Sequence, residues 1–268
     1  MWLAELNVAA DAARQAGELL RSMQDGITVR EKGPADLVTE ADLASQQLIM
    51  QRIRDHWPDD GVLGEEDPQR ADVLNRLPEL ERCWIVDPLD GTTNFVHGLD
   101  NYGVSIALAV RGEVCVGVVY DPVRDELFQA RRGGGAQLNA APLRVSSTQR
   151  LDQALVAASL PARVHRDSAE VHRFLEVLFQ AQAVRRLGSA ALNLCYVGRG
   201  TIDAYWATSV QAWDVAAGLL VVTEAGGVTS RIDGRIIDLR VGDILAASTP
   251  PLQREIVAVL EAVPGPAR

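Results

Sequence analysis

The spacing of apolar segments changes at about residue 150, and this change constrains the possible folds more than any other feature of the chain. From residue 102 to residue 146, apolar runs of strand length follow one another with only tight turns between them, such as Arg111-Gly112-Glu113. Connections this short join antiparallel strands. Beyond residue 150, runs of strand length alternate with helical segments, which is typical of α/β units. The sequence therefore predicts an antiparallel sheet followed by an α/β half.

Individual elements follow from periodicity and from turn residues. An amphipathic helix is expected over residues 2–24, a second helix over 40–56, and a brief strand within 57–67. Near the end of the chain we expect a hairpin with Asp233-Gly234 at its tip. The remaining predicted helices are 168–181, 189–198, 214–225 and 251–263, and the remaining predicted strands are 83–87, 102–110, 113–121, 125–132, 136–146, 154–160, 183–188, 202–207 and 243–248.

Length and composition limit the domain organisation and the kind of partner. The chain has 268 residues, 47% hydrophobic and 23% charged, which suffices for one large domain or two closely packed halves. We expect an N-terminal α+β half over 1–150 and a C-terminal α/β half over 151–268. The net charge of -10, from 26 basic and 36 acidic residues, argues against a nucleic-acid partner. The acidic excess reflects either solubility alone or a local cation site.

The cysteines and the amino-terminal segment indicate the compartment. Cys83, Cys115 and Cys195 lie in separate apolar runs and form no C-x-x-C pair. We therefore expect buried free thiols in a reducing compartment, in place of disulfides or a zinc site. The amino-terminal segment carries acidic residues at helical spacing, so neither a signal peptide nor a membrane-spanning helix is expected. These features predict a cytoplasmic protein with no membrane partner.

Acidic residues recur where predicted elements begin or end. In the segment "WIVDPLDGTTNF", an apolar strand runs into Asp87 and Asp90. Glu65 follows a short apolar run, and Asp214 begins an apolar helix. Each position also has a purely structural interpretation: Asp90 and Asp214 suit helix starts, and Glu65 suits a solvated loop.

Considered together, these four acidic residues favour a metal site. If their carboxylates converge, mutual repulsion raises their pKa values unless cations neutralise them. Oxygen ligands without histidine or cysteine select Mg²⁺ or Mn²⁺. The adjoining Gly91-Thr92-Thr93 supplies backbone N–H groups at a helix start, where a phosphate binds. Divalent cations beside a phosphate site indicate phosphoryl chemistry.

At this level of detail the chain resembles the inositol monophosphatase family of Mg²⁺-dependent, lithium-sensitive phosphatases. The resemblance rests on "GEE" at 64–66, "WIVDPLDGTTNFVHG" at 84–98 and "WDVAAGLLVVTEAGG" at 213–227. The segment "KGPADLVTEAD" at 32–42 is similar to the family's amino-terminal block, and the match covers nearly the whole chain. It implies a layered α-β-α-β-α sandwich of the sugar-phosphatase type, within the α+β and α/β classes, that usually forms a homodimer.

The resemblance also implies the ligands of two or three Mg²⁺ ions, with Mn²⁺ as a substitute. Glu65, Asp87 and the backbone carbonyl of Leu89 would hold the first ion. Asp87, Asp90 and Asp214 would hold the second. A third, weaker ion would lie beside Glu65.

Further implied roles concern catalysis and substrate binding. Thr92 would orient the attacking water together with Asp42, and Glu65 and Asp87 would contribute through the metal. Asp42 also fits a capping box with Thr39, and Ser189 alone is equally well explained as a helix cap. The implied contacts with the phosphate and the substrate are Gly91, Thr92, Thr93, Gly188, Ser189, Ala190 and Asp214.

One departure from the family leaves the substrate open. Family members that prefer inositol phosphate carry a glutamate that contacts sugar hydroxyls, and this chain has Ala207 at that position. We predict a Mg²⁺-dependent phosphomonoesterase that uses a metal-activated water without a covalent intermediate, with inositol 1-phosphate as the leading substrate. Histidinol phosphate, a sugar phosphate and a 3′-phosphonucleotide are the alternative small substrates. Another alternative is a phosphatase-fold protein that mainly binds another macromolecule.

Overall fold

The computed structural model describes residues 1–24, 29–33 and 36–263. Its helices are α1 (Leu3–Met23), α2 (Glu40–His56), α3 (Arg70–Arg76), α4 (Thr92–Val96), α5 (Ala169–Gln180), α6 (Ala190–Gly198), α7 (Ala212–Glu224) and α8 (Pro250–Ala262), with a 3₁₀ turn η1 (Leu151–Gln153). Its strands are β1 (Val29–Gly33), β2 (Asp36–Thr39), β3 (Gly61–Gly64), β4 (Cys83–Asp90), β5 (Gly103–Val110), β6 (Glu113–Asp121), β7 (Glu126–Arg131), β8 (Ala136–Leu138), β9 (Ala141–Pro142), β10 (Leu155–Ser159), β11 (Ala183–Arg185), β12 (Ala204–Thr208), β13 (Val228–Ser230) and β14 (Asp243–Ala247). None of the helices in this part of the chain combines the length and hydropathy that a membrane crossing requires.

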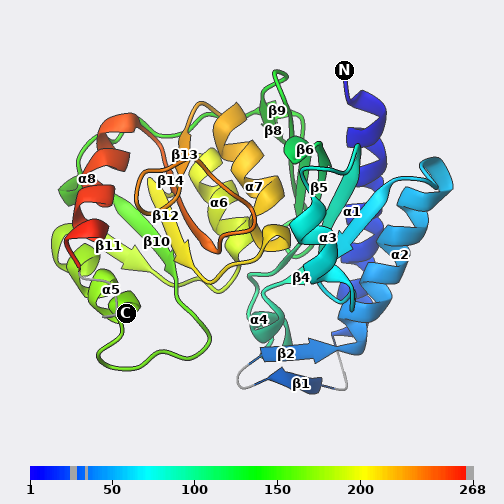
Figure 1. Ribbon diagram of the computed structural model, residues 1–268, viewed down its shortest axis with the longest axis horizontal. Helices are drawn as coiled ribbons and strands as arrows, with labels where there is room; N and C mark the ends of the chain where they lie inside the picture. The colour runs from blue at the N-terminus through cyan, green and yellow to red at the C-terminus, as the bar shows by residue number, and fades with distance from the viewer. Residues whose placement is uncertain (25–28, 34–35, 264–268) are drawn as a thin grey trace.

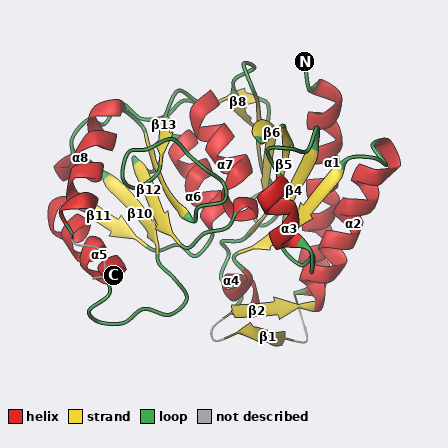
Figure 2. Ribbon diagram, in the orientation of Figure 1, coloured by secondary structure: helices red, strands yellow, loops and turns green. Residues whose placement is uncertain are grey.

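These elements form five layers. Figure 1 shows α1 and α2 at one side, then a large sheet, then α6 and α7, then a smaller sheet, and finally α5 with α8. Figure 2 shows the same alternation of helical and strand layers in one view. Three apolar clusters of buried side chains fill the spaces between the layers. The predicted α-β-α-β-α sandwich is therefore confirmed.

The large sheet has seven strands in the order β3-β4-β5-β6-β7-β8-β9. Only β3 and β4 of this sheet run parallel, and the strands from β4 onward form an antiparallel meander. Strand β4 is buried on both faces. Its Trp84 and Val86 face the α1–α2 layer, whereas Cys83 and Ile85 face the α6–α7 layer. The last residues of β4 therefore lie deep between two helical layers.

Helix α1 packs on the outer face of this sheet through small side chains. Ala9, Ala12, Ala13 and Ala16 are all fully buried, at the three- and four-residue spacing of one helical face. Because the interior is close-packed, the helix lies so near the sheet at these alanines that larger side chains would not fit. The spacing of this face explains why the sequence predicted the helix.

The smaller sheet has the strand order β11-β10-β12-β14-β13. Strands β11, β10 and β12 run parallel, and β14 is antiparallel to both of its neighbours. Residues of β12 alternate between the two apolar clusters that flank this sheet. Tyr205 and Ala207 face α6 and α7, while Ala204 and Trp206 face α5 and α8. Helices α6 and α7 thus cover both sheets. The division of the chain into two halves at residue 150 stays a prediction.

Most of the predicted elements are confirmed, and α2 begins and ends at the predicted residues. The single strand predicted over 136–146 is wrong, because Asn139 and Ala140 adopt positive φ values of 46° and 70° and a turn separates β8 from β9. Strand β4 continues past the predicted 83–87, since Asp90 still pairs with Gly103. Strands β1 and β2 and helix α3 were not predicted, and α3 buries none of its side chains. All three cysteines are buried free thiols as expected, and the reducing compartment stays a prediction.

The packing of α1 gives a prediction about stability. Replacing Ala13 with leucine forces extra methylenes into a filled interface, so we expect the free energy of unfolding to fall by about 1–3 kcal/mol. The same change at Ala4, which is exposed on the same helix, is the matched control and should alter stability by less than about 0.5 kcal/mol. Urea denaturation followed by circular dichroism measures both. Equal effects at the two positions would contradict the packing described for α1.

Candidate active site

The end of β4 brings two aspartates into the interior. Asp87 is 2% exposed and Asp90 is 7% exposed. The Asp87 carboxylate accepts a hydrogen bond from the backbone N–H of Leu89 at 3.0 Å, which turns the chain between the two acids. The pairing of β4 with β5 is irregular at this point, between Asp87 and Asp90. The Ser45 hydroxyl of α2 donates to the carbonyl of Pro88 at 2.8 Å and fixes the turn from the other side.

Asp90 is bound to the start of α6. Its carboxylate accepts hydrogen bonds from the Ser189 hydroxyl, from the backbone N–H of Ala190 at 3.2 Å and from that of Ala191 at 2.7 Å. The Ser189 hydroxyl also accepts from the backbone N–H of Leu192, so Ser189 is the N-cap of α6. A carboxylate at a helix N-terminus is favoured by the helix dipole. The structural interpretation of Ser189 as a cap is confirmed. The interpretation of Asp90 as the cap of the helix that begins near Gly91 is wrong, because α4 has no side-chain cap and the Asp90 carboxylate binds the start of α6 instead.

Asp214 occupies the first turn of α7. Its carboxylate accepts a hydrogen bond from the backbone N–H of Gln211 at 2.7 Å, which closes the start of the helix. The Ser105 hydroxyl of β5 donates to the carbonyl of Trp213 at 3.0 Å in the buried interior. This bond holds the start of α7 against the large sheet and places Asp214 beside Asp87 and Asp90.

The three aspartates perturb one another. Burial raises the pKa of Asp87 well above its usual range, and the negative charges of Glu65, Asp90 and Asp214 raise it further. Burial also raises the pKa of Asp90 to about 6, although the hydrogen bonds from Ser189 and the α6 backbone oppose this rise. The pKa of Asp214 is raised well above its usual range by burial and by the charges of Asp90 and Glu65.

No lysine or arginine relieves this repulsion within the described part of the chain, since the ion pairs found there involve none of the three aspartates. Glu65 follows β3, and its backbone N–H donates to the carbonyl of Val86 at 3.1 Å. Within the same residues no three Asp, Glu, His or Cys side chains are arranged closely enough to enclose an ion as they stand. Asp90 and Asp214 direct carboxylate oxygens to helix N-termini.

Thr92 and Asp42 meet beside the aspartates. The Thr92 hydroxyl lies 3.2 Å from a carboxylate oxygen of Asp42 and 3.0 Å from the carbonyl oxygen of Leu89. The hydroxyl has one proton to donate, so these two acceptors compete for it. Asp42 is fully buried and forms the expected capping box with Thr39 at the start of α2. The capping interpretation and the pairing of Asp42 with Thr92 therefore hold at the same time.

Two glycines allow the backbone to approach closely at this point. Gly91 precedes α4 with a φ of 94°, and a Cβ there would lie 3.1 Å from the carbonyl oxygen of Asn101. Gly188 precedes α6 with a φ of 88°, and its Cβ would lie 2.6 Å from the Asn94 amide. Other residues are strained at such φ values. The starts of α4 and α6 are therefore held together by positions that only glycine suits.

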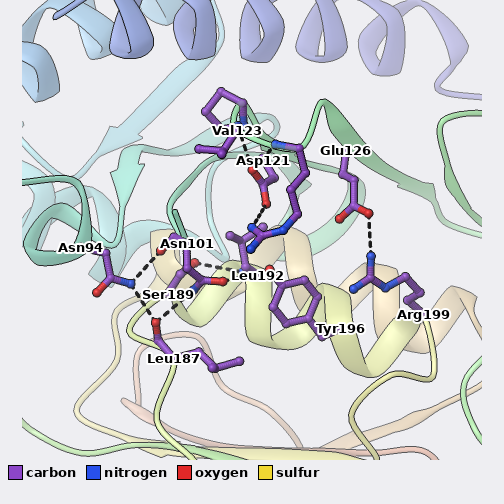
Figure 3. A network of polar contacts seen from close by, with 12 residues as sticks. Asn94, Asn101, Asp121, Val123, Glu126, Leu187, Ser189, Leu192, Tyr196 and Arg199 are labelled. Carbon is purple, nitrogen blue, oxygen red and sulfur yellow. Dashed lines mark hydrogen bonds and ion pairs between the residues drawn. The ribbon is translucent and has the colours of Figure 1, made fainter. Parts of the chain in front are cut away.

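An asparagine pair links the two helix starts. Asn94 donates to the carbonyls of Asn101 and Leu187, both at 2.7 Å, and Asn101 donates to Leu187 at 3.0 Å (Figure 3). The Tyr196 hydroxyl of α6 donates to the Asn101 side chain at 2.9 Å. Neither asparagine was predicted from the sequence as a site residue. The only signal was the position of Asn94 directly after the Gly-Thr-Thr segment.

A cleft of about 520 Å³ opens beside Asp90 and Asp214. Of the predicted substrate contacts, Gly188, Ala190 and Asp214 line it. Ser189 is fully buried beneath its wall, and its hydroxyl is engaged with Asp90 and Leu192. The other residues that line the cleft are Ala158, Ser159, Leu160, Pro161, Ala162, Arg186, Thr208, Ser209 and Val210.

Known proteins are similar to this chain in sequence and in fold. A sequence model of the inositol monophosphatase family matches residues 2–264. A Pseudomonas aeruginosa protein named Nus factor SuhB is 42% identical over 256 residues, which cover 91% of each chain. An inositol-1-monophosphatase of Mesorhizobium japonicum is 40% identical over 266 residues, covering 97% of this chain and 96% of that relative. The crystal structure of the extragenic suppressor protein suhB from Bartonella henselae has a TM-score of 0.87 at 37% identity, covering 96% of this chain and 98% of that chain.

The raised pKa values predict how stability depends on pH. A carboxyl whose pKa is raised by folding binds its proton more tightly in the folded state, so its stabilising contribution is complete below its ordinary pKa and is lost as pH rises. For Asp90 this loss spans the interval between 3.8 and about 6. We expect the thermal midpoint of the protein in chelator to fall as pH is raised from about 4.5 to about 7.5.

Asp90→Asn removes one of these titrations and should make that dependence shallower, whereas Asp72→Asn, at an exposed acid of α3, should leave it unchanged. Calorimetry in chelator measures both slopes. A thermal midpoint that does not fall over this range in the unaltered protein would contradict the electrostatic description of the site.

Proposed function

This chain belongs to the inositol monophosphatase family, and from this premise we propose that it is a Mg²⁺-dependent phosphomonoesterase acting on a small phosphorylated alcohol. One observation carries the proposal. Three buried carboxylates with raised pKa values lie close together, two of them at the wall of a cleft, and no basic side chain within the described residues pairs with them. Burying such a group without a counter-charge is costly, so a bound cation would stabilise the arrangement.

The chemistry of the donor set fits Mg²⁺. The proposed ligands of the ions offer only oxygen atoms, which Mg²⁺ and Mn²⁺ prefer. We propose that Glu65, Asp87 and the carbonyl of Leu89 hold one ion, that Asp87, Asp90 and Asp214 hold another, and that a third lies beside Glu65. When bound, the ions lower the pKa of a coordinated water and neutralise charge on the phosphoryl oxygens.

The surrounding residues would position the water and the phosphate. The Thr92 hydroxyl lies between Asp42 and the carbonyl of Leu89, so it can donate a hydrogen bond to one of them and accept one from a water. Asp42 is held by Thr39 and would keep the hydroxyl oriented. The backbone N–H groups of the Gly91–Thr93 segment begin α4 and would bind the phosphate oxygens. In this proposal Asp90 is a metal ligand, and no covalent intermediate forms.

Inositol 1-phosphate is the first substrate to test, because the Mesorhizobium japonicum relative is named an inositol-1-monophosphatase. Ala207 weakens this choice, since it offers no polar group to a polyol. Histidinol phosphate, a sugar phosphate and a 3′-phosphonucleotide are the alternatives. The assay measures release of inorganic phosphate with Mg²⁺, with Mn²⁺, with chelator and with added lithium, to which we expect the activity to be sensitive.

A second candidate function is binding to another macromolecule. The observation that favours it is the 42% identity to a protein named Nus factor SuhB. If no substrate in the assay releases phosphate, this second function becomes the preferred proposal. The homodimer and the cytoplasmic location expected from the sequence stay predictions, and light scattering on the purified protein tests the first of them.

The variant Asp87→Asn tests the proposed metal site. It removes a carboxylate assigned to two ions, so phosphate release with Mg²⁺ should fall by more than about 100-fold. Mutating residues that only hydrogen-bond to metal ligands already lowers metal affinity or activity by about 10–100-fold. The fold should persist, because the substitution keeps the shape of the side chain and removes repulsion. The exposed Asp72→Asn is the matched control and should retain full activity. Normal turnover by Asp87→Asn would show that the ligand assignment is wrong.

A pair of variants tests the role of Thr92. Thr92→Val removes the hydroxyl at constant shape, so we expect kcat to fall by about 100-fold or more while KM changes little. Thr92→Ser keeps the hydroxyl and should retain most of kcat. Steady-state kinetics on the best substrate separates the two parameters. Equal kcat values for the valine and serine variants would rule out a role for the hydroxyl in positioning the water.

A further inference from the structure

We propose that the cleft selects phosphorylated alcohols that carry a second anionic group, a carboxylate or another phosphate, and that Arg186 binds this group. The inference rests on the proposed phosphatase function and narrows its substrate class. It is based on the charges and hydrogen-bonding groups in the cleft wall away from the proposed metal site.

The acidic groups of the cleft gather at one end. Of its lining residues, Asp90 and Asp214 are acidic, and both belong to the proposed metal site. The rest of the wall comes from the end of β10, the segment before α6, and the end of β12 with the residues that follow. That part is neutral apart from Arg186.

Ala207 contributes no polar group to this wall. Its side chain is fully buried among apolar residues between β12 and the α6–α7 layer, and it does not line the cleft. A carboxylate at this end would accept hydrogen bonds from the hydroxyls of a neutral polyol and would repel an anion. Apart from Asp90 and Asp214, the wall carries no carboxylate, so this end of the cleft presents no negative charge against an anion.

Arg186 is placed and free to bind an anion. It is exposed at the cleft wall, and no hydrogen bond or ion pair joins its guanidinium to the described residues. Its neighbour Leu187 is fixed, since Asn94 and Asn101 donate to the Leu187 carbonyl (Figure 3). A guanidinium presents paired N–H donors that match a carboxylate or a phosphate.

Thr208 supplies a second, independent observation. This residue is 8% exposed, lines the cleft at the end of β12, and its hydroxyl has no hydrogen-bond partner in the described structure. A buried hydroxyl without a partner costs free energy, which a ligand oxygen would recover. Together, Arg186 and Thr208 give the wall two donors suited to an anion.

The adjacent Arg185 is an ordinary surface arginine and contrasts with Arg186. It is also exposed, but its guanidinium donates to the carbonyl of Val184 at 3.0 Å, and it does not line the cleft. The two arginines therefore differ in the property that the inference requires, and Arg185 provides a control variant.

The experiment compares kcat/KM within two matched substrate pairs, with Mg²⁺ present. Glycerol 3-phosphate and 3-phosphoglycerate differ by a carboxylate, and fructose 1-phosphate and fructose 1,6-bisphosphate differ by a phosphate. We expect the unaltered protein to favour the more anionic member of at least one pair by about tenfold, the effect of a charged hydrogen bond. The pair that shows the preference identifies whether the second anion is a carboxylate or a phosphate.

Variants then assign the preference to its source. Arg186→Ala should abolish the tenfold ratio, Arg186→Lys should retain part of it, and Thr208→Val should reduce it by a few-fold. Arg185→Ala should leave the ratio unchanged. The inference is overturned if the unaltered protein does not favour the more anionic member of either pair, or if Arg186→Ala lowers both members of a pair equally. If no phosphomonoester releases phosphate, the proposed function itself fails, which is a different result from release without discrimination.

Discussion

The hydrogen bonds that Asp90 accepts at the start of α6 are the interaction on which the rest of the site depends. Asp90 ends a strand of the large sheet, whereas Ser189 and Ala191 begin a helix about a hundred residues later in the chain. The carboxylate is buried, so losing these donors would leave it without partners in an apolar interior. The position of α6 against β4 is therefore fixed at this point. That position sets where Gly188 and Ala190 stand relative to Asp214 across the cleft.

The structural and functional interpretations of the acidic residues describe the same geometry. Asp42, Asp90 and Asp214 each accept backbone N–H groups at the start of a helix, namely α2, α6 and α7. The positive ends of these helices thus converge with carboxylates whose repulsion they partly offset. The start of α4 adds a fourth helix terminus. In the proposed function, the start of α4 would bind the phosphate while the carboxylates at the starts of α6 and α7 would bind the metal.

Local sequence predicted the parts of this structure that depend on periodicity. The continuous apolar run of β4 and the spacing of the alanines in α1 follow directly from which faces are buried, and the capping box at Thr39 follows from four residues. Asn139 favours a turn with positive φ, but Ala140 does not and no glycine is present, so 136–146 resembled one strand. The contacts of Ser189, Asn94 and Asn101 join segments that are distant in sequence, and one chain carries no sign of them. The sequence does not distinguish Arg186 from Arg185, because only the fold determines that Arg186 alone lines the cleft.

The middle layer has a consequence for the order in which the protein can form on the ribosome. The last strand of the large sheet ends at Pro142, but α7, which covers its inner face, ends only at Glu224. At about 5–20 residues per second, translation of the intervening chain takes roughly 4–16 s. During that interval Ile85, Ala107 and Val119 have no helical layer to cover them. The nascent chain must therefore keep an apolar sheet face from associating with other chains until its own second half arrives.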